Sequence, residues 1–189
     1  MIYKTETSSL FSIDLDTLGE INNLIITSDS VFIADLDFND DFTENKYLKV
    51  INSVEKVRKL SFRVYRTFKG LRAIETTRLH PLSSGNERLQ SVGILQSLYS
   101  DEKYVDYVID SRLYAARLSP KQDRKEEDYI CELIKVSNTP SNYQIGAFLR
   151  VHDSFCLLNS EWCSEWKSYD LKSTREEREI PQNNLDTPF

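Results

Sequence analysis

The sequence predicts an α+β fold, a mostly antiparallel sheet with helices packed on it, in a single domain over residues 1–170. A hairpin signal at 62–78 lies among apolar runs of strand length, which indicates antiparallel pairing. Segments 44–60 and 85–99 carry apolar residues at helical spacing and lie between the strands. Few strands are followed by a clean helical crossover, which favours α+β over α/β.

The composition is that of a globular protein with one core. The chain has 189 residues, of which 40% are hydrophobic and 29% charged, and its net charge is −6. It contains no apolar run of about 18 residues that would cross a membrane, and its N-terminus lacks a signal-peptide pattern. Its cysteines, Cys131, Cys156 and Cys163, lack metal-site spacing, so we expect reduced thiols in a cytoplasmic protein. Residues 171–189 are polar and are expected to form a C-terminal tail.

The remaining elements follow from periodicity and from capping residues. In chain order we expect a strand at 8–15, an ambiguous helix or strand ending at 27, a strand at 31–37, a helix from Thr43 to about 60, helices at 85–99 and 102–109, a strand at 110–120, a strand or short helix at 129–136 and a helix at 145–158. Asp101 is expected to cap the helix at 102–109.

The segment 31–41 is the most informative stretch of the chain. An apolar run there leads into Asp35 and Asp37, which are one residue apart. Side chains alternate along a strand, so both carboxylates emerge on the same side, roughly 6.5–7 Å apart. Two such carboxylates suit Mg²⁺ or Mn²⁺, which take oxygen ligands. An Asp-x-Asp at a strand end is equally compatible with a polar exit into a turn.

Charge is strongly segregated around this strand. Residues 29–44 contain six acidic and no basic residues, whereas 56–78 contain eight basic residues and one acidic residue. If Lys69-Gly70 forms the hairpin turn, Thr67 lies opposite Arg72 and Tyr65 opposite Ile74. The residues expected to share one exposed face are Arg63, Tyr65, Thr67 and Arg72. Such a face either binds phosphate or is simply solvated.

Three short motifs resemble those of the archaeo-eukaryotic primase superfamily, the primase-polymerases, and occur in that family's order. Ile33-Ala-Asp35-Leu-Asp37 is similar to the hhhDhD strand of the family. Thr67-Phe-Lys-Gly70-Leu-Arg72 is similar to its Ser/Thr-x-x-Gly-x-His hairpin, with Arg72 at the histidine position. Ile109-Asp110 resembles the third element, with basic residues after it, and the resemblance covers about residues 31–121.

The resemblance implies a divergent, active or once-active site for metal-dependent nucleotidyl transfer on nucleic acid. Asp35, Asp37 and Asp110 would be the catalytic ligands of Mg²⁺ or Mn²⁺, with Asp153 as a rival for the third position. The residues expected near the phosphates are Arg63, Thr67, Arg72, Arg112, Arg117 and Lys121. The implied partners are a nucleoside triphosphate and single-stranded or primed nucleic acid, and a protein partner is also open. Arginine binds phosphate in a bidentate fashion but is not a general acid at neutral pH. We expect Arg72 to be exposed at the strand end.

Two other classes of function stay open on the sequence. A non-enzymatic nucleic-acid-binding or protein-interaction module would use the hairpin aromatics Phe62, Tyr65 and Phe68 to stack bases. Another Asp-x-Asp metal enzyme is the second alternative, either a phosphotransferase of the haloacid dehalogenase type or a glycosyltransferase. The first of these needs a Rossmann-like βα scaffold, whereas here a hairpin follows.

Overall fold

The structure, a computed structural model, describes residues 12–16, 23–118 and 132–156. Its elements are β1 (Ser12–Asp16), β2 (Asn23–Ser28), β3 (Ile33–Asp37), α1 (Glu44–Arg58), β4 (Phe62–Arg66), β5 (Gly70–Glu75), α2 (Gly85–Ser97), α3 (Glu102–Ser111), β6 (Tyr114–Arg117), β7 (Glu132–Val136) and α4 (Tyr143–Cys156). The α+β class is therefore confirmed. The expected tail at 171–189 lies outside the described residues. In the described ranges, no helix has the length and apolar character needed to cross a membrane.

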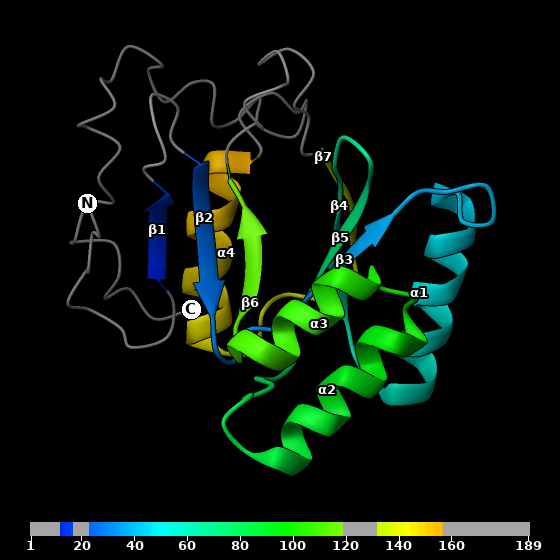
Figure 1. Ribbon diagram of the computed structural model, residues 1–189. Coiled ribbons are helices and arrows are strands. Elements are labelled where there is room, and N and C mark those ends of the chain that lie inside the picture. The colour runs from blue at the N-terminus through cyan, green and yellow to red at the C-terminus, as the bar shows by residue number, and fades with distance from the viewer. Residues whose placement is uncertain (1–11, 17–22, 119–131, 157–189) are drawn as a thin grey trace, which may run out of the picture.

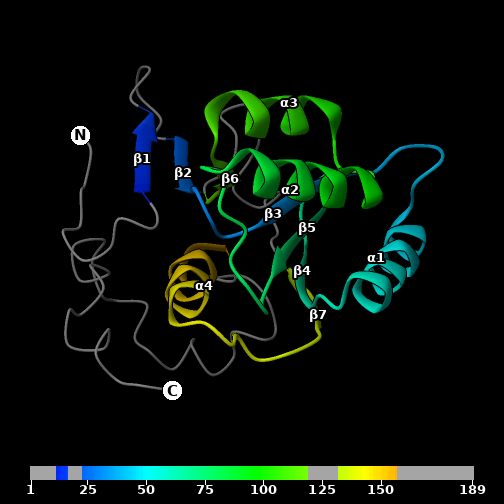
Figure 2. The same ribbon diagram turned by 90° about the horizontal axis from the view of Figure 1, so that it is seen from below.

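The strands form two antiparallel sheets that lie side by side. One sheet has the order β1-β2-β6 and the other the order β3-β5-β4-β7. Helices α2 and α3 lie on one side of the strands and α4 lies on the other, as the two views show (Figures 1 and 2). The strand that carries the Asp-x-Asp motif pairs with β5 in antiparallel fashion, unlike a parallel Rossmann-like sheet.

The core forms where the apolar periodicity predicted it. Tyr47, Ile51 and Val54 recur at spacings of four and three, and all three are buried on one face of α1. The apolar residues of β3, Ile33, Ala34 and Leu36, are fully buried on both faces of the strand. Thr43 occupies the N-cap position of α1, as predicted, although its side chain makes no capping hydrogen bond.

The expected register of the hairpin was wrong by two residues. Tyr65 pairs with Arg72, and the turn spans residues 67–69, closed by the Thr67 N–H, which donates to the Gly70 carbonyl at 2.9 Å. Gly70 is the first residue of β5 and lies opposite Asp37. A Cβ added there would lie 2.0 Å from the carbonyl oxygen of Leu36, so glycine is required by close strand approach. A two-residue slip keeps the same side chains on each face.

The strand expected at 110–120 begins later than the sequence indicated. Asp110 lies in the last turn of α3, and the strand is limited to Tyr114–Arg117. The helix ends at Arg112, which adopts a left-handed conformation with φ 56° and donates its N–H to the Val108 carbonyl. Arg112 thus ends the helix in the conformation typical of a C-terminal cap. Asp110 therefore belongs to a helix end and is exposed.

A tyrosine hydroxyl joins the two sheets. The Tyr104 hydroxyl on α3 donates to the Ile33 carbonyl of β3 at 3.1 Å and accepts from the Ala115 N–H of β6 at 3.3 Å. It thereby satisfies two backbone groups at the boundary where the adjacent edges of the sheets meet. Burial raises the pKa of this hydroxyl well above its usual value, so it remains protonated and able to donate.

We expect Tyr104→Phe to lower the free energy of unfolding by about 1–3 kcal/mol, because it leaves two backbone groups without their partner. Urea unfolding followed by circular dichroism measures this change. Tyr107→Phe, three residues along the same helix at a half-exposed position, is the control and should change stability little. Equal stability of both variants would contradict the bridging role.

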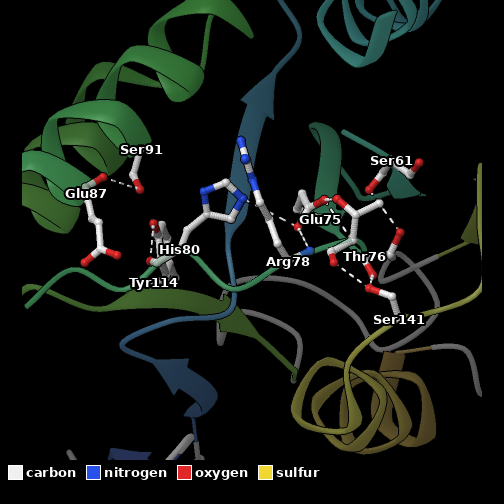
Figure 3. A network of polar contacts seen from close by, with 10 residues as sticks. Ser61, Glu75, Thr76, Arg78, His80, Glu87, Ser91, Tyr114 and Ser141 are labelled. Carbon is white, nitrogen blue, oxygen red and sulfur yellow. Dashed lines mark hydrogen bonds and ion pairs between the residues drawn. The ribbon is translucent and has the colours of Figure 1, made fainter. Parts of the chain in front are cut away.

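A buried carboxylate organises the loop that follows β5. Glu75 accepts hydrogen bonds from the Thr77 N–H at 2.8 Å and from the Arg78 N–H at 2.9 Å, and His80 Nε2 lies 3.5 Å from it. The next residue, Thr76, is hydrogen-bonded to Ser61 and Ser141, so β5, β4 and the start of α4 are joined here (Figure 3). Burial raises the pKa of Glu75, but the hydrogen bonds from His80, Thr77 and Arg78 outweigh it and hold the pKa below its usual value.

This lowered pKa predicts a pH dependence of stability. The contribution of Glu75 is complete above its unfolded pKa of about 4.5 and is lost as the pH falls through the lower folded-state value. Glu75→Gln should therefore cost about 1–3 kcal/mol at pH 7 and flatten the decline in stability below about pH 4.5. Denaturant unfolding from pH 3 to pH 7 tests this, with the exposed Glu87→Gln as control. A decline as steep as in the wild type would show that another group is responsible.

Candidate functional site

The Asp-x-Asp motif and the hairpin motif are neighbours in the folded chain. Asp35 lies directly opposite Arg72 and Asp37 opposite Gly70 in the β3–β5 pair. Asp35 and Asp37 share one face of β3 because side chains alternate along a strand. Asp35 is half-buried and Asp37 is exposed, at the point where β3 leaves the sheet. Residues 33 to 37 positions apart in the sequence therefore meet at one end of the sheet, because α1 and β4 return the chain to β3.

A third carboxylate lies at the same end of β3. The carbonyl of Asp35 accepts from the Ser100 hydroxyl at 2.7 Å and from the Asp101 N–H at 3.0 Å. The Asp101 side chain caps α3 by accepting from the Tyr104 N–H at 3.0 Å. The sequence identified Asp101 only as a helix cap. Its proximity to Asp35 depends on a tertiary contact that no local pattern reveals.

The hydroxyl of Tyr47 lies beside this acidic group. It lies 3.0 Å from the Asp37 carbonyl and 3.3 Å from the Tyr99 carbonyl. Burial raises the pKa of Tyr47, and the charges of Asp37, Asp101 and Asp35 raise it further. Three carboxylates thus act on one hydroxyl, which places a concentration of negative charge at the end of β3.

Arg72 is buried, in contrast to the exposed position expected from the sequence. Its side chain is only 6% exposed, and Nη1 donates to the Arg117 carbonyl of β6 at 3.0 Å. β3 lies between β5 and β6 (Figure 2), and Arg72 is the direct partner of Asp35 across the β3–β5 pair. The guanidinium therefore reaches β6 on the face of β3 that carries Asp35. Arg72 is therefore both a cation beside the acidic group and a link between the two sheets.

His152 on α4 contacts the same guanidinium. Its Nε2 lies 3.2 Å from Arg72 Nη1, and its Nδ1 lies 3.2 Å from Asp153 Oδ1. A guanidinium has only donors, so Nε2 must accept and the ring proton must be on Nδ1, directed at Asp153. This arrangement assigns a neutral His152 that orients Arg72. The sequence drew attention to this segment only through Asp153.

The hairpin face expected to bind phosphate is engaged with α4. Asp153 accepts from the Tyr65 hydroxyl at 2.7 Å and forms an ion pair with Arg63 at 2.9 Å. Phe62 and Tyr65 are fully buried, and of the three hairpin aromatics only Phe68, in the turn, is exposed. Arg63 and Tyr65 therefore hold α4 against the sheet, and base stacking on Phe62 or Tyr65 is excluded in this conformation.

The other residues predicted for the site lie at several places. Asp101 N–H bonds to Asp35, and Asp110 is nine residues further along α3, about 13 Å at the helical rise of 1.5 Å per residue. Arg112 is exposed just beyond that far end, whereas Arg117 ends β6 beside Arg72. Thr67 lies in the hairpin turn, and Lys121 falls outside the described residues. The structure brings together Asp35, Asp37, Arg72 and Arg117 and separates Asp110 from them.

The carboxylates present fit a magnesium or manganese site only in part. In the ranges 12–16, 23–118 and 132–156 no group of three or more histidine, cysteine or acidic side chains is arranged to hold a metal ion. Mg²⁺ is commonly bound through one or two carboxylates, with water and substrate phosphates completing the shell. Asp35 and Asp37 fit such a site, whose affinity would depend on a phosphate ligand.

No protein-family model, curated protein or solved structure matches the chain. Function is therefore inferred from the residues of the site and from the motifs they form.

We expect Arg72→Ala to lower the free energy of unfolding by about 1.5–3 kcal/mol, the range for hydrogen bonds to a charged group. Arg78→Ala is a matched control, because that side chain is exposed and follows the same strand. Urea unfolding of both variants measures the difference. If the two arginines prove equally dispensable, Arg72 does not link the sheets.

Proposed function

We propose that the chain is a primase-polymerase-like domain that binds a nucleoside triphosphate through a divalent cation at Asp35 and Asp37. The observation that supports this most strongly is the register of β3 and β5, in which Asp35 faces Arg72. The first two motifs of the resemblance are thereby adjacent, with two carboxylates and one guanidinium on one sheet face. A metal ion held by carboxylates and a positively charged side chain beside it can together neutralise the charge of phosphate groups.

Each residue of the proposed site has a distinct role. Asp35 and Asp37 would hold Mg²⁺ or Mn²⁺, which when bound supplies charge neutralisation for the triphosphate and activation of a terminal 3′-hydroxyl. The backbone of Asp35 is held in place by the hydrogen bonds that Ser100 and Asp101 donate to its carbonyl, which fixes the position from which its carboxylate extends. Arg72, oriented by His152, adds positive charge at the same face. The acidic residue nearest to this pair at the start of α3 is Asp101, and we propose that it supports the site in place of Asp110, which the resemblance implied as a metal ligand.

A second candidate function is ligand binding without catalysis. It is favoured because Arg63 and Arg72 already interact with other groups of the protein. Arg63 is paired with Asp153, and Arg72 donates to a backbone carbonyl, so each has a structural partner. A domain of this kind would retain nucleotide or nucleic-acid binding and lack nucleotidyl transfer. Single-stranded nucleic acid and a protein partner are the ligands that this alternative proposes.

Titration of a labelled nucleoside triphosphate with Mn²⁺, or with chelator instead, tests the proposal. We expect triphosphate binding to require the metal. The Asp37→Asn variant should bind the triphosphate at least about tenfold more weakly, the lower end of the range for loss of a group that supports a metal site. Asp110→Asn is the control and should bind as the wild type does, because Asp110 lies at the other end of α3. Binding that is equal with Mn²⁺ and with chelator would refute the metal assignment. Extension of a labelled primer then separates the enzyme from the binding domain.

A further inference from the structure

Aromatic side chains gather beside the acidic end of β3. The rings of Phe42 and Tyr99 lie 4.6 Å apart, and the Tyr47 ring lies 5.0 Å from Phe42 and 6.3 Å from Phe38. Tyr47 is buried beneath, whereas Tyr99 is 57% exposed and Phe38 is 37% exposed. We name Phe38, Phe42 and Tyr99 the aromatic platform. Phe38 directly follows the Asp-x-Asp motif, whereas Phe42 and Tyr99 lie outside the segments that the sequence singled out.

The backbone of Tyr99 is in a conformation that glycine prefers. Its φ is 56°, and the Ser100 N–H donates to the Leu95 carbonyl at 3.0 Å to close the end of α2. Lys59 and Arg112 adopt similar φ values at the ends of α1 and α3, where a basic side chain suits the negative end of a helix. Tyrosine has no such electrostatic reason to occupy this position. Residues held in strained conformations cluster at functional sites, which directs attention to the exposed ring.

Tyr47 connects the platform to the acidic group. The Tyr47 hydroxyl is within hydrogen-bond distance of the carbonyls of both Asp37 and Tyr99. On the far side, Lys46 Nζ lies 4.3 Å from the centre of the Phe42 ring. The rings therefore adjoin a hydroxyl on which the charges of Asp35, Asp37 and Asp101 act, and Phe42 is also covered by a cation.

We propose that the aromatic platform stacks the nucleobase of a nucleotide or of a single-stranded nucleic acid. This inference rests on the proposed function, since the phosphates would lie at Asp35 and Asp37 and the base on the neighbouring rings. A base offers a flat face to the rings and amino groups to the carboxylates. Three partly exposed rings form an area far smaller than the roughly 800 Å² per partner of a stable protein interface. The acidic end of β3 near the platform also suits a polar aromatic ligand better than an aliphatic one.

Tyr99→Gly is the decisive variant, because glycine relieves the strained φ while removing the ring. The fold should therefore be retained, and any loss of binding reports on the side chain. Tyr107→Ala removes a half-exposed tyrosine of α3 outside the platform and is the control. The probes are ATP and inorganic tripolyphosphate, each with Mn²⁺, and an oligothymidylate in chelator, all titrated calorimetrically.

The wild type should bind ATP about tenfold more tightly than tripolyphosphate, within the range for stacking one base. Tyr99→Gly should abolish that difference, and Tyr107→Ala should preserve it. An ATP preference that survives in Tyr99→Gly, or a wild type that binds both probes equally, would overturn the platform. If tripolyphosphate and ATP both fail to bind but the oligonucleotide binds and is weakened by Tyr99→Gly, the platform stands and the metal site fails. Failure of all three probes overturns both.

Discussion

A buried tyrosine hydroxyl links the edges of the two sheets. Between β3 and β6, where a backbone ladder would otherwise join the sheets, Tyr104 donates to one strand and accepts from the other. A single tyrosine can do this because a hydroxyl is both donor and acceptor. Its position is set by Asp101, which caps the helix three residues earlier and bonds to β3 through its own N–H. The start of α3 is therefore built into the junction of the sheets.

The candidate site lies at the acidic end of the same junction. Arg72 reaches from β5 across β3 to the Arg117 carbonyl of β6, so it makes a second link between the sheets on the face of Asp35. His152 and Asp153 complete this link from α4, on the opposite side of the strands from α3. The polar residues that would serve a ligand thus also hold the sheets and α4 together. A site of this kind is preorganised, because its side chains are fixed by the fold before any ligand arrives.

The sequence predicted the parts of the fold that have a local signature. The helical spacing of Tyr47, Ile51 and Val54 and the apolar run before Asp35 were sufficient for α1 and β3. The hairpin register was not predictable from turn preferences, because Gly70 is required by the close approach of β3 and not by the turn. The burial of Arg72 and the roles of Asp101 and His152 arise from contacts between residues 45 to 80 positions apart. Charge patterning in one segment carries no information about such partners.

Gly70 also has a consequence for how this domain tolerates change. The alignment of Arg72 with Asp35 is fixed where Gly70 passes Asp37, and the Phe38 N–H extends this pairing by donating to the Lys69 carbonyl at 2.8 Å. Residues 67 and 68 form the connection between β4 and this paired segment. Lengthening that connection would leave the alignment intact, since closing a slightly longer loop costs little. The hairpin tip is thus a permissive position for an inserted peptide or probe, close to the acidic end of β3 and outside the core.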